Sequence, residues 1–396
     1  MIALLGWGAL ALLGTLALWA RLLQQAGRMQ TERVRDLERP RDLSAWPTVT
    51  AIVPTYNEAR DVEACLEALL AVDYPRLEVL VTDDGSSDDT VARVEALAAR
   101  APEGVVRVRT TARDDPRRAD WTLNKSFALW TAAQEVQSDW LWFLDADVRV
   151  DPDALWRSLL ACRRENALGF TCGGRYTNPS ALGEALEVVM YLLLTALLPL
   201  RAIRDPGRPD ASWITGQYLL IQRAAYEGLG GHAAVQGCSM DDLPLSRVAK
   251  RAGVKLLYFP GAAIFACVNY VTLAETRRNW VRLGVLAAPW LGWTADTYRG
   301  AAVALVGLGV LSPALAALAW GLAPGSLAAW LLLAQVAATL LLVLVLQASL
   351  GVRLWTALCL PVSATLATAL VLQIAGALEG EVEFHGQRLT QDVPLP

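Results

Sequence analysis

The stretch Trp140-Leu141-Trp142-Phe143-Leu144-Asp145-Ala146-Asp147 decides the expected fold of this chain. Its apolar run predicts a short buried strand, and two carboxylates follow at the point where that strand stops. Side chains two positions apart on an extended backbone share a face, so Asp145 and Asp147 are expected to point the same way. Hard oxygen ligands of this kind suit Mg²⁺ or Mn²⁺. A D-x-D pair also occurs where carboxylates merely solvate a loop. The neighbouring sequence therefore has to distinguish a metal site from a solvated loop.

Those surroundings alternate between strand-like and helix-like segments. Strands are expected over residues 48–53, 77–81, 105–109 and 140–144, and helices over residues 61–70, 89–99 and 124–136. This alternation predicts an α/β domain with a mostly parallel, doubly wound sheet. Such sheets bind ligands beyond the carboxyl ends of their strands. The D-x-D pair, the Pro54-Thr55-Tyr56-Asn57-Glu58 segment and the Asp83-Asp84 pair all follow strands, which predicts one shared site.

The segment from Asp83 to Thr90 has two interpretations. The first is structural: a turn at Gly85 is followed by Ser87 or Asp88, which caps the next helix. The second is functional, because Asp83 and Asp84 stand at a strand end and could hydrogen-bond a nucleobase N–H or a ribose hydroxyl.

The pair Asp241-Asp242 opens a helical run over residues 243–251. Spacing alone favours an acidic first turn that matches the helix dipole. The alternative is chemical, with Asp242 as a base that deprotonates a hydroxyl group. Gln217 could hydrogen-bond a ligand or belong to a plain turn, and His232, beside two glycines, is expected to be structural or to orient an acceptor.

Composition separates the middle of the chain from its ends. Hydrophobic residues make up 54% and charged residues 19% of the 396 residues, and the mean hydropathy is +0.34. The net charge of -4 argues against a nucleic-acid partner, and the sequence indicates no obligatory protein partner. Six cysteines without a CxxC pair and two histidines disfavour a zinc site and predict free thiols in a reducing compartment.

The uncharged ends predict membrane spans. No charged residue occurs from Ile2 to Ala20, and three further spans are expected at roughly 301–322, 326–350 and 354–378. The uncharged stretch 283–295 is short and favours an interfacial segment, whereas 188–200 could be a core helix or a membrane-lying one. The positive-inside rule places the middle domain in the cytoplasm, because arginines follow the first span at Arg21, Arg28, Arg33, Arg35, Arg39 and Arg41. The number of C-terminal spans, and with it the side of the tail, stays open.

The motifs around Pro54, Asp83, Asp145 and Asp241 follow one another along the chain as in glycosyltransferase family 2. The chain resembles that family over roughly residues 48–280. Within that family the chain is similar to membrane-bound, lipid-directed enzymes: ceramide glucosyltransferase-like, hopanoid-associated and carotenoid glycosyltransferases. The segment Thr215-Gly216-Gln217 contributes to this likeness. The resemblance implies a GT-A fold and transfer of one hexose from a nucleotide-sugar, with a UDP-sugar favoured, to a hydroxyl of a membrane lipid.

The resemblance also implies roles for individual residues. Asp145 and Asp147 are expected to bind the metal and the diphosphate, and Asp242 to be the general base of an inverting displacement, with Asp241 beside it. Tyr56 is expected to pack on the base. The nucleotide-sugar is expected to contact Pro54, Thr55, Tyr56, Glu58, Asp83, Asp84, Lys125, Asp145, Gly216, Gln217 and Arg278.

Three positions depart from the family pattern. Relatives carry Trp-Thr-Gly-Lys where this chain has Trp121-Thr122-Leu123-Asn124-Lys125, and their Glu-Asp is Asp241-Asp242 here. The Q-x-x-R-W signature of processive polysaccharide synthases is absent. Arg277-Arg278-Asn279-Trp280 occupies a comparable place and is expected to contact diphosphate or to anchor at the interface.

The resulting organisation is a series of six segments: an N-terminal transmembrane helix (1–22), a basic cytosolic linker (23–46), a GT-A domain (47–280), an interfacial segment (281–299), C-terminal transmembrane helices (300–378) and a tail (379–396). The expected location is the cell (inner) membrane, with the catalytic domain cytoplasmic. Two rival hypotheses remain: a processive polysaccharide synthase, and a non-catalytic scaffold or transport subunit that keeps a degenerate sugar-binding domain.

Overall fold

The chain divides into two compact units, which are described separately. The computed structural model describes residues 1–27, 34, 37–42, 45–178, 180–198, 202–203, 205, 207–208, 211–259, 264–268, 272–350, 353–379, 382–384 and 387–389. The sheet unit comprises Glu32–Arg175, Arg201–Val268 and Pro394–Pro396, and the helical unit comprises Met1–Thr31, Tyr176–Leu200 and Asn269–Val393. Of the arginines that follow the first span and indicate its cytoplasmic side, Arg28, Arg33 and Arg35 lie outside the described residues.

A seven-stranded sheet forms the centre of the sheet unit. Its strands, in spatial order, are β3 (Val106–Thr110), β2 (Leu77–Asp83), β1 (Val49–Thr55), β4 (Trp140–Leu144), β8 (Tyr218–Gln222), β6 (Gly169–Cys172) and β9 (Leu256–Phe259). β8 pairs antiparallel with both β4 and β6, while the other neighbouring pairs are parallel. The prediction of an α/β fold with a mostly parallel sheet is therefore confirmed.

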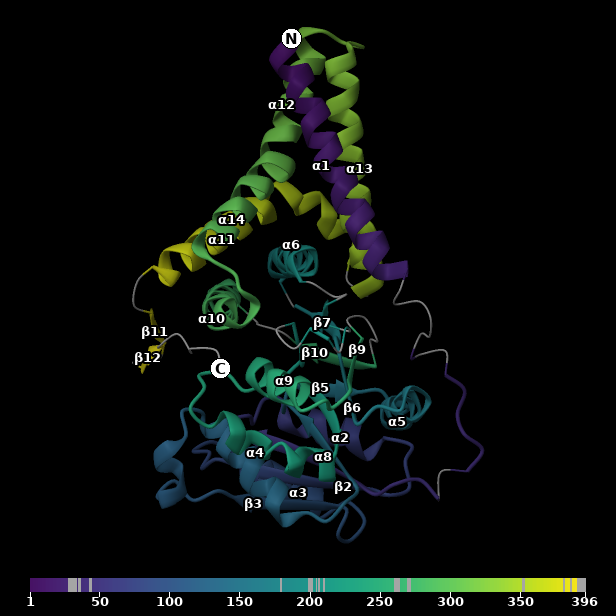
Figure 1. The fold of residues 1–396 in the computed structure, drawn as a ribbon, viewed down its shortest axis with the longest axis vertical. Helices are drawn as coiled ribbons and strands as arrows, with labels where there is room; N and C mark the ends of the chain where they lie inside the picture. The colour runs from purple at the N-terminus through teal and green to yellow at the C-terminus, as the bar shows by residue number, and fades with distance from the viewer. Residues whose placement is uncertain are drawn as a thin grey trace. The chain divides into compact units, whose positions relative to one another are not determined.

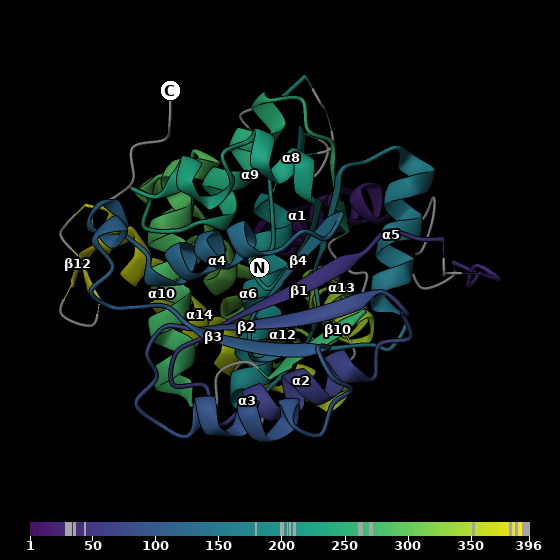
Figure 2. The same ribbon diagram turned by 90° about the horizontal axis from the view of Figure 1, so that it is seen from below.

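Helices cover both faces of this sheet, which is why its central strands read as continuous apolar runs. Figure 2 shows α2 (Val62–Leu70) and α3 (Thr90–Ala98) on one face and α4 (Asn124–Glu135) on the other. The remaining helices of the unit are η2 (Pro116–Asp120), α5 (Ala154–Glu165), α8 (Arg223–Gly228), η3 (Gly231–Val235) and α9 (Asp242–Arg251). Trp142, Tyr218 and Phe170 are fully buried side chains of the central strands.

A second, smaller sheet follows the D-x-D pair directly. β5 (Val148–Val150) pairs antiparallel with β10 (Phe265–Val268), and β7 (Arg175–Thr177) is its third strand. In this register Cys267 faces Val148. A segment far along the chain is thereby placed next to the two carboxylates.

The predicted element boundaries were right to within one or two residues, with one instructive difference. β1 continues through Pro54 to Thr55 instead of ending before the proline. The pairing of β1 with β4 ends at Ile52, whereas its pairing with β2 runs on to Thr55. The strand therefore continues on its β2 side past the proline, which has no N–H to donate.

The helical unit is built from α1 (Ile2–Gly27), α6 (Ala181–Leu197), α10 (Leu273–Leu291), α11 (Ala295–Leu305), η4 (Val306–Leu311), α12 (Ser312–Leu322), α13 (Leu327–Leu350), η5 (Leu354–Cys359) and α14 (Leu360–Leu378). A short hairpin of β11 (Val382–Phe384) and β12 (Gln387–Leu389) follows. Among the described residues, four helices are long and apolar enough to cross a membrane: Ile2–Leu22, Ala295–Leu322, Leu327–Ala348 and Leu354–Leu378. These agree with the four segments expected from the sequence.

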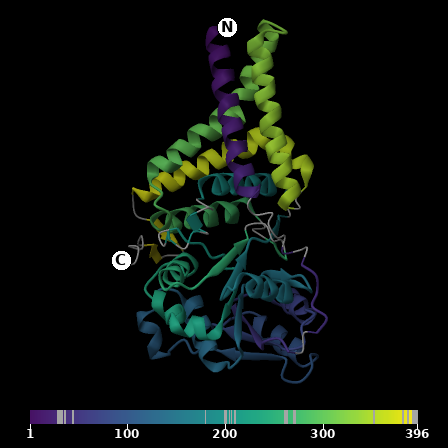
Figure 3. The same ribbon diagram turned by 45° about the vertical axis from the view of Figure 1, so that its right-hand side comes forward.

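Buried polar side chains join α1 to α13, and Figures 1 and 3 show the two helices running side by side. Gln335 Nε2 donates to Thr339 Oγ1 at 2.8 Å and to Thr15 Oγ1 at 3.4 Å. Trp19 donates its indole N–H to the carbonyl of Ala338 at 3.0 Å. Hydrogen bonds between apolar helices average about 0.6 kcal/mol each, so they fix the pairing of α1 with α13 more than they stabilise it.

The structure also decides between the two interpretations of residues 188–200. α6 packs with α10 and α14 inside the core of the helical unit, where Val188, Val189 and Met190 are buried. It is therefore a core helix of the unit that contains the candidate spans. The uncharged stretch 283–295 is divided between α10, which ends at Leu291, and α11, which begins at Ala295.

Candidate active site

The residues singled out by the sequence converge at the carboxyl edge of the seven-stranded sheet. Parallel pairing aligns Thr55 with Asp83, so the loops after β1 and β2 leave the sheet together. Antiparallel pairing aligns Leu144, which precedes the D-x-D pair, with Tyr218, which follows Gly216-Gln217. The ends of β1, β2 and β4 and the beginning of β8 therefore meet at one edge, because β8 runs antiparallel to β4.

Asp83 organises the loops at this edge from the inside. It is 1% exposed, and its carboxylate accepts hydrogen bonds from the Thr55 hydroxyl, from the Gly85 N–H and from both the N–H and the hydroxyl of Ser86. Asn57 adopts a left-handed conformation with φ of 56°, and its side chain accepts from the N–H of Ser87. The loops after β1 and β2 are thus locked to each other.

The same loop contains the expected helix cap. Asp88 Oδ1 accepts from the N–H of Thr90 at 3.0 Å, although the residue directly before α3 is Asp89, which makes no side-chain capping bond. Asp88 therefore satisfies an N–H at the start of α3, as the structural interpretation of this segment predicts.

Two arginines that the sequence did not single out contact Tyr56 and Asp84 at this edge. The Arg113 guanidinium lies 4.8 Å from the centre of the Tyr56 ring, and the Tyr56 side chain is 51% exposed. Arg118 forms an ion pair with Asp84 and also donates to Asn124. Both arginines lie in the segment after β3, and their position at the end of a third parallel strand is the one signal that could have indicated them.

The two carboxylates of the D-x-D pair have different partners. Asp145 Oδ1 lies 2.5 Å from Lys125 Nζ. Asp147 Oδ2 accepts from the Cys267 thiol at 3.1 Å, and that thiol accepts from Gln217 Nε2 at 3.3 Å. Asp147 Oδ1 is buried and has no hydrogen-bond partner among the described residues. Neither Cys267 nor the chain of contacts through it was predicted.

These oxygens fit a hard divalent ion. A buried carboxylate oxygen without a partner is costly to keep unless a ligand satisfies it, and oxygen donors are what Mg²⁺ and Mn²⁺ prefer. In the part of the chain that the structure describes, no three His, Cys, Asp or Glu side chains form a metal site by themselves. Asp145 and Asp147 would hold the ion together with water and phosphate oxygens, as is usual for Mg²⁺.

The negative charges at this edge contribute to raised pKa values at Asp147 and Glu58. Burial, followed by the charge of Asp145, raises the pKa of Asp147 to about 6. Burial, followed by the charges of Asp147 and Asp145, raises the pKa of Glu58 to about 7. The charge that Glu58 senses from both residues places the end of the Pro54–Glu58 segment beside the D-x-D pair, as expected.

Asp241 and Asp242 form the other side of the site. Asp241 precedes α9 but makes no side-chain capping bond; its Oδ2 accepts from the Ser126 hydroxyl at 3.2 Å. Burial is the largest single influence and acts to raise the pKa of Asp241. The charge of Lys125 and several smaller effects together outweigh burial, so the pKa of Asp241 is lowered. Burial and the charge of Asp241 raise the pKa of Asp242 to about 7. The pair therefore has the split acid–base character that proton transfer needs.

A small hollow opens between this pair and Gly216. A Cβ added to Gly216 would lie 3.3 Å from Asp242 Oδ2, so a side chain there would crowd the carboxylate. His232 is buried beside the hollow, and its Nδ1 is 2.7 Å from the hydroxyl of Tyr226. Burial lowers the pKa of His232 to about 4, and its bond to Tyr226 ties the imidazole into this loop.

Arg278 belongs to a different unit from the other predicted site residues. It lies on α10 in the helical unit, so it is not among the residues that the sheet unit brings together by itself. Pro54, Thr55, Tyr56, Glu58, Asp83, Asp84, Lys125, Asp145, Asp147, Gly216, Gln217, Asp241 and Asp242 all belong to the sheet unit.

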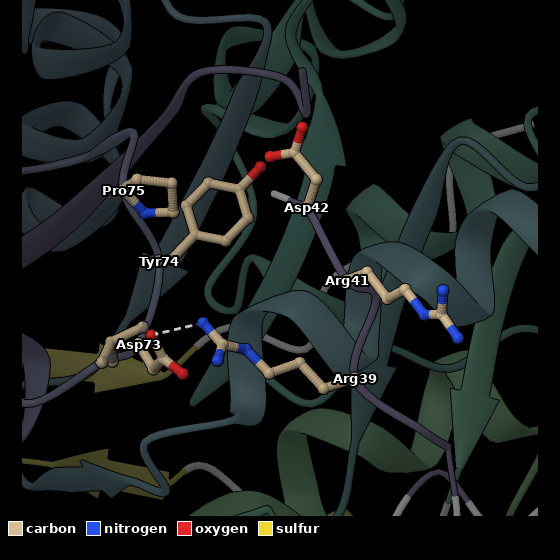
Figure 4. A pocket seen from close by; sticks show the side chains of 7 residues that line it. Arg39, Arg41, Asp42, Asp73, Tyr74 and Pro75 are labelled. Carbon is tan, nitrogen blue, oxygen red and sulfur yellow. Dashed lines mark hydrogen bonds and ion pairs between the residues drawn. The ribbon is translucent and has the colours of Figure 1, made fainter. Parts of the chain in front are cut away.

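A further pocket lies elsewhere in the sheet unit. It measures about 440 Å³ and is lined by Arg39, Arg41, Asp42, Val72, Asp73, Tyr74 and Pro75 (Figure 4). Arg39 forms an exposed ion pair with Asp73 at 2.8 Å inside it. Pro75 lies two residues before Leu77, where β2 begins, so this pocket is at the amino ends of the parallel strands. Ligands of doubly wound sheets bind at the opposite ends.

Comparisons with known proteins agree with this geometry. The family model described as "Glycosyltransferase like family 2" matches residues 47–284. The chain is 23% identical over 186 residues to the poly-beta-1,6-N-acetyl-D-glucosamine synthase of Staphylococcus epidermidis, and 24% identical over 183 residues to that of Staphylococcus aureus (strain COL). Each match covers 46% of this chain and 41% of the relative's length.

Two solved structures are also similar. The mannosyltransferase PcManGT from Pyrobaculum calidifontis, in complex with GDP-Man and Mn²⁺, is 22% identical with a TM-score of 0.49, and the match covers 94% of this chain and 99% of that one. The glucosyl-3-phosphoglycerate synthase from Mycobacterium tuberculosis, with Mn²⁺, UDP and glucosyl-3-phosphoglycerate, is 21% identical with a TM-score of 0.40, covering 65% and 87%.

Proposed function

Because the chain belongs to the glycosyltransferase-like family 2 and has the GT-A fold, we propose that it moves one hexose from a nucleotide-sugar to a hydroxyl of a membrane lipid. The observation that carries the proposal is that Asp145, Asp147 and Asp242 gather in one unit at the carboxyl edge of its sheet. A sugar transfer needs a metal that stabilises the departing diphosphate and a base that takes the proton of the acceptor hydroxyl. Asp145 and Asp147 can hold such a metal, and the raised pKa of Asp242 suits such a base.

The donor half rests on the loops after β1, β2 and β4. Tyr56, with Arg113 on its ring, offers a stacking surface for a base. Lys125 and the D-x-D pair offer the charges that a diphosphate and its cation need. A bound Mg²⁺ or Mn²⁺ would neutralise the charge that develops on the departing diphosphate. The favoured donor is a UDP-sugar, by the family resemblance.

The acceptor half rests on Asp242. Its carboxylate takes the proton from the acceptor hydroxyl while that oxygen attacks carbon-1 of the sugar from the face opposite the diphosphate. The carbon–oxygen bond to the diphosphate breaks and the configuration at carbon-1 inverts. Asp241, held ionised by Lys125 and bonded to Ser126, keeps a negative charge beside Asp242 and so supports its basicity.

A lipid acceptor is supported by the helical unit. Four described helices are long and apolar enough to cross a membrane, and helices of that kind would bring the protein to the surface where a lipid hydroxyl is found. The arginines after the first span favour a cytoplasmic sheet unit in the cell (inner) membrane. Arg278 on α10 would then contact the diphosphate or the lipid interface.

The test uses the full-length protein in purified membranes with labelled UDP-glucose, with and without Mn²⁺. Transfer of label to extracted lipid is expected only with the ion. Asp145→Asn is expected to abolish transfer, and Asp242→Asn to lower its rate by about 10²–10⁴-fold. Asp114→Asn, at an exposed position outside the site, is the matched control. Full activity of either site variant would remove the role assigned to that residue.

A processive polysaccharide synthase is the second candidate. It is favoured by the curated relatives, which are named poly-beta-1,6-N-acetyl-D-glucosamine synthases, although this chain matches only 41% of their length. The absence of a Q-x-x-R-W sequence before the spans counts against it. Product analysis separates the two candidates, because a single sugar per lipid excludes a synthase and a sugar polymer excludes the lipid-directed transfer.

A further inference from the structure

Lys125 occupies an unusual position at the start of α4. It is the second residue of this helix, whose cap residue Leu123 makes no side-chain capping bond. A positive charge in a first turn opposes the helix dipole and costs about 0.3–1 kcal/mol at exposed positions. The ion pair with Asp145 offsets this cost, because Lys125 Nζ lies 2.5 Å from Asp145 Oδ1. The lysine is therefore held in place by the site and not by the helix.

The ammonium group takes up one of the two carboxylates that a metal would need. Lys125 Nζ is 2.5 Å from Asp145 Oδ1, whereas Asp147 Oδ1 has no hydrogen-bond partner among the described residues. Half of the metal site is thus open and half is filled by a cation. Two cations that share one partly buried carboxylate repel each other, so an ion arriving alone must first displace the lysine.

We propose that Lys125 guards Asp145 until a nucleoside diphosphate draws it away, so that the divalent ion enters as its complex with the nucleotide-sugar. This inference rests on the proposed function, because it concerns the same donor site. The diphosphate brings acceptor oxygens for the ammonium group in the same event that brings the metal. Lys125 then leaves Asp145 for a phosphate oxygen, and the ion takes its place between Asp145 and the diphosphate.

The proposal has a consequence for the end of the reaction. When the nucleoside diphosphate leaves, it removes the partner of Lys125 and the remaining ligands of the metal together. Lys125 returns to Asp145, and the ion departs with the product. The protein therefore keeps no bound ion between turnovers. Its affinity for free metal is low because Lys125 occupies Asp145, although the carboxylate ligands are present.

The test measures Mn²⁺ binding directly, by the loss of the free-ion signal in electron paramagnetic resonance, on the full-length protein in detergent. Without nucleotide the unaltered protein is expected to bind Mn²⁺ weakly, and Lys125→Met to bind it about tenfold more tightly or better. With UDP present the unaltered protein is expected to bind Mn²⁺ more tightly than Lys125→Met, because the variant has lost a contact to the phosphates. Lys125→Arg keeps the charge and is expected to exclude free Mn²⁺ as the unaltered protein does.

Lys255→Met is the matched control, because Lys255 pairs with Glu165 at an exposed site on the same unit. It is expected to leave both affinities unchanged. If Lys125→Met does not fold, Lys125→Gln tests the same expectation. Unchanged or weaker binding of free Mn²⁺ in the neutral variant overturns the guarding role and leaves the metal site intact. Absence of Mn²⁺ binding to the unaltered protein even with UDP overturns the metal-dependent function itself.

Discussion

At the scale of single residues, Asp241 and Asp242 differ because they have different neighbours. Asp241 lies beside Lys125 and accepts from Ser126, whereas the main charge that Asp242 senses is that of Asp241. Adjacent carboxylates in one buried place cannot both ionise freely, so the proton stays on the one without a cation. The two titrate as a pair, and the pKa of about 7 describes the more basic step.

This pair predicts the pH dependence of transfer. A general base must be deprotonated, so the rate is expected to rise with pH through about 7, the raised pKa of Asp242. Asp241→Asn removes the second largest cause of that rise in pKa while burial remains. In the variant the rise of the rate is therefore expected at lower pH, measured as initial rates between pH 5 and 9. If the rise stays at the same pH, a group other than Asp242 controls it.

Cys267 is predicted to position Asp147 for the metal. Its thiol donates to Asp147 Oδ2, whereas Oδ1 has no hydrogen-bond partner among the described residues. Cys267→Ala is expected to weaken Mn²⁺ binding in the presence of UDP by about 10–100-fold, the usual effect of losing a group that orients a ligand. Cys267→Ser, which still donates a hydrogen bond, is expected to recover most of the affinity.

The control for Cys267 is another buried thiol of the sheet unit. Cys172→Ser lies on β6 and is fully buried away from the carboxylates. Equal losses of Mn²⁺ affinity in Cys172→Ser and Cys267→Ala would show that the effect comes from packing and not from Asp147.

At the scale of elements, the loops after β1 and β2 act as one piece because Asp83 bonds to both. Asp83→Ala leaves buried N–H and hydroxyl groups without an acceptor, and each such loss costs about 1–3 kcal/mol. We expect a fall of about 2–4 kcal/mol in the free energy of unfolding of the sheet unit, together with weaker UDP binding.

The control for Asp83 lies in the same loop. Asp89 is exposed and makes no side-chain capping bond, so Asp89→Ala is expected to change stability by no more than about 0.5 kcal/mol. Thermal unfolding and UDP titration of both variants check the comparison. If the two variants lose stability equally, the hydrogen bonds of Asp83 do not hold the loops together.

At the scale of the whole molecule, the chain passes from the sheet unit to the helical unit within β7, forms α6, and returns to the sheet unit before β8. α6 is tied into the helical unit by Glu184, which is buried and pairs with Arg353 at 2.6 Å ahead of the last candidate span. The backbone N–H of Arg353 donates to the same carboxylate. A segment from the middle of the chain thus becomes part of the helical core.

This ion pair predicts the stability of the helical unit. Arg353→Ala leaves the buried carboxylate of Glu184 without its cation, at a cost of about 2–3 kcal/mol, toward the low end for such pairs because Arg353 is 43% exposed. A lower Tm in detergent is expected. Arg299, which pairs with Glu379 at an exposed position, supplies the control, since Arg299→Ala is expected to cost less than about 1 kcal/mol. Equal Tm values for the two variants would contradict the assignment.

The sequence predicted the parts that depend on local pattern. The five-residue apolar run before Asp145 and the spacing of the four candidate spans were placed correctly because they depend on the period and length of nearby residues. The element between them was ambiguous. Residues 188–200 are apolar enough for either a core or a membrane surface, and composition cannot distinguish these environments.

The candidate site divides in the same way. By itself the sequence determined that carboxylates stand at strand ends, and it predicted that a ligand binds at this edge. Only the tertiary structure decided that Lys125 meets Asp145, that Cys267 contacts Asp147 and Gln217 contacts Cys267, and that Arg113 lies on Tyr56. The physical reason is strand pairing: β8 and β10 bring their residues to the site through antiparallel registers. Such registers depend on which strands become neighbours, and no local pattern records that choice.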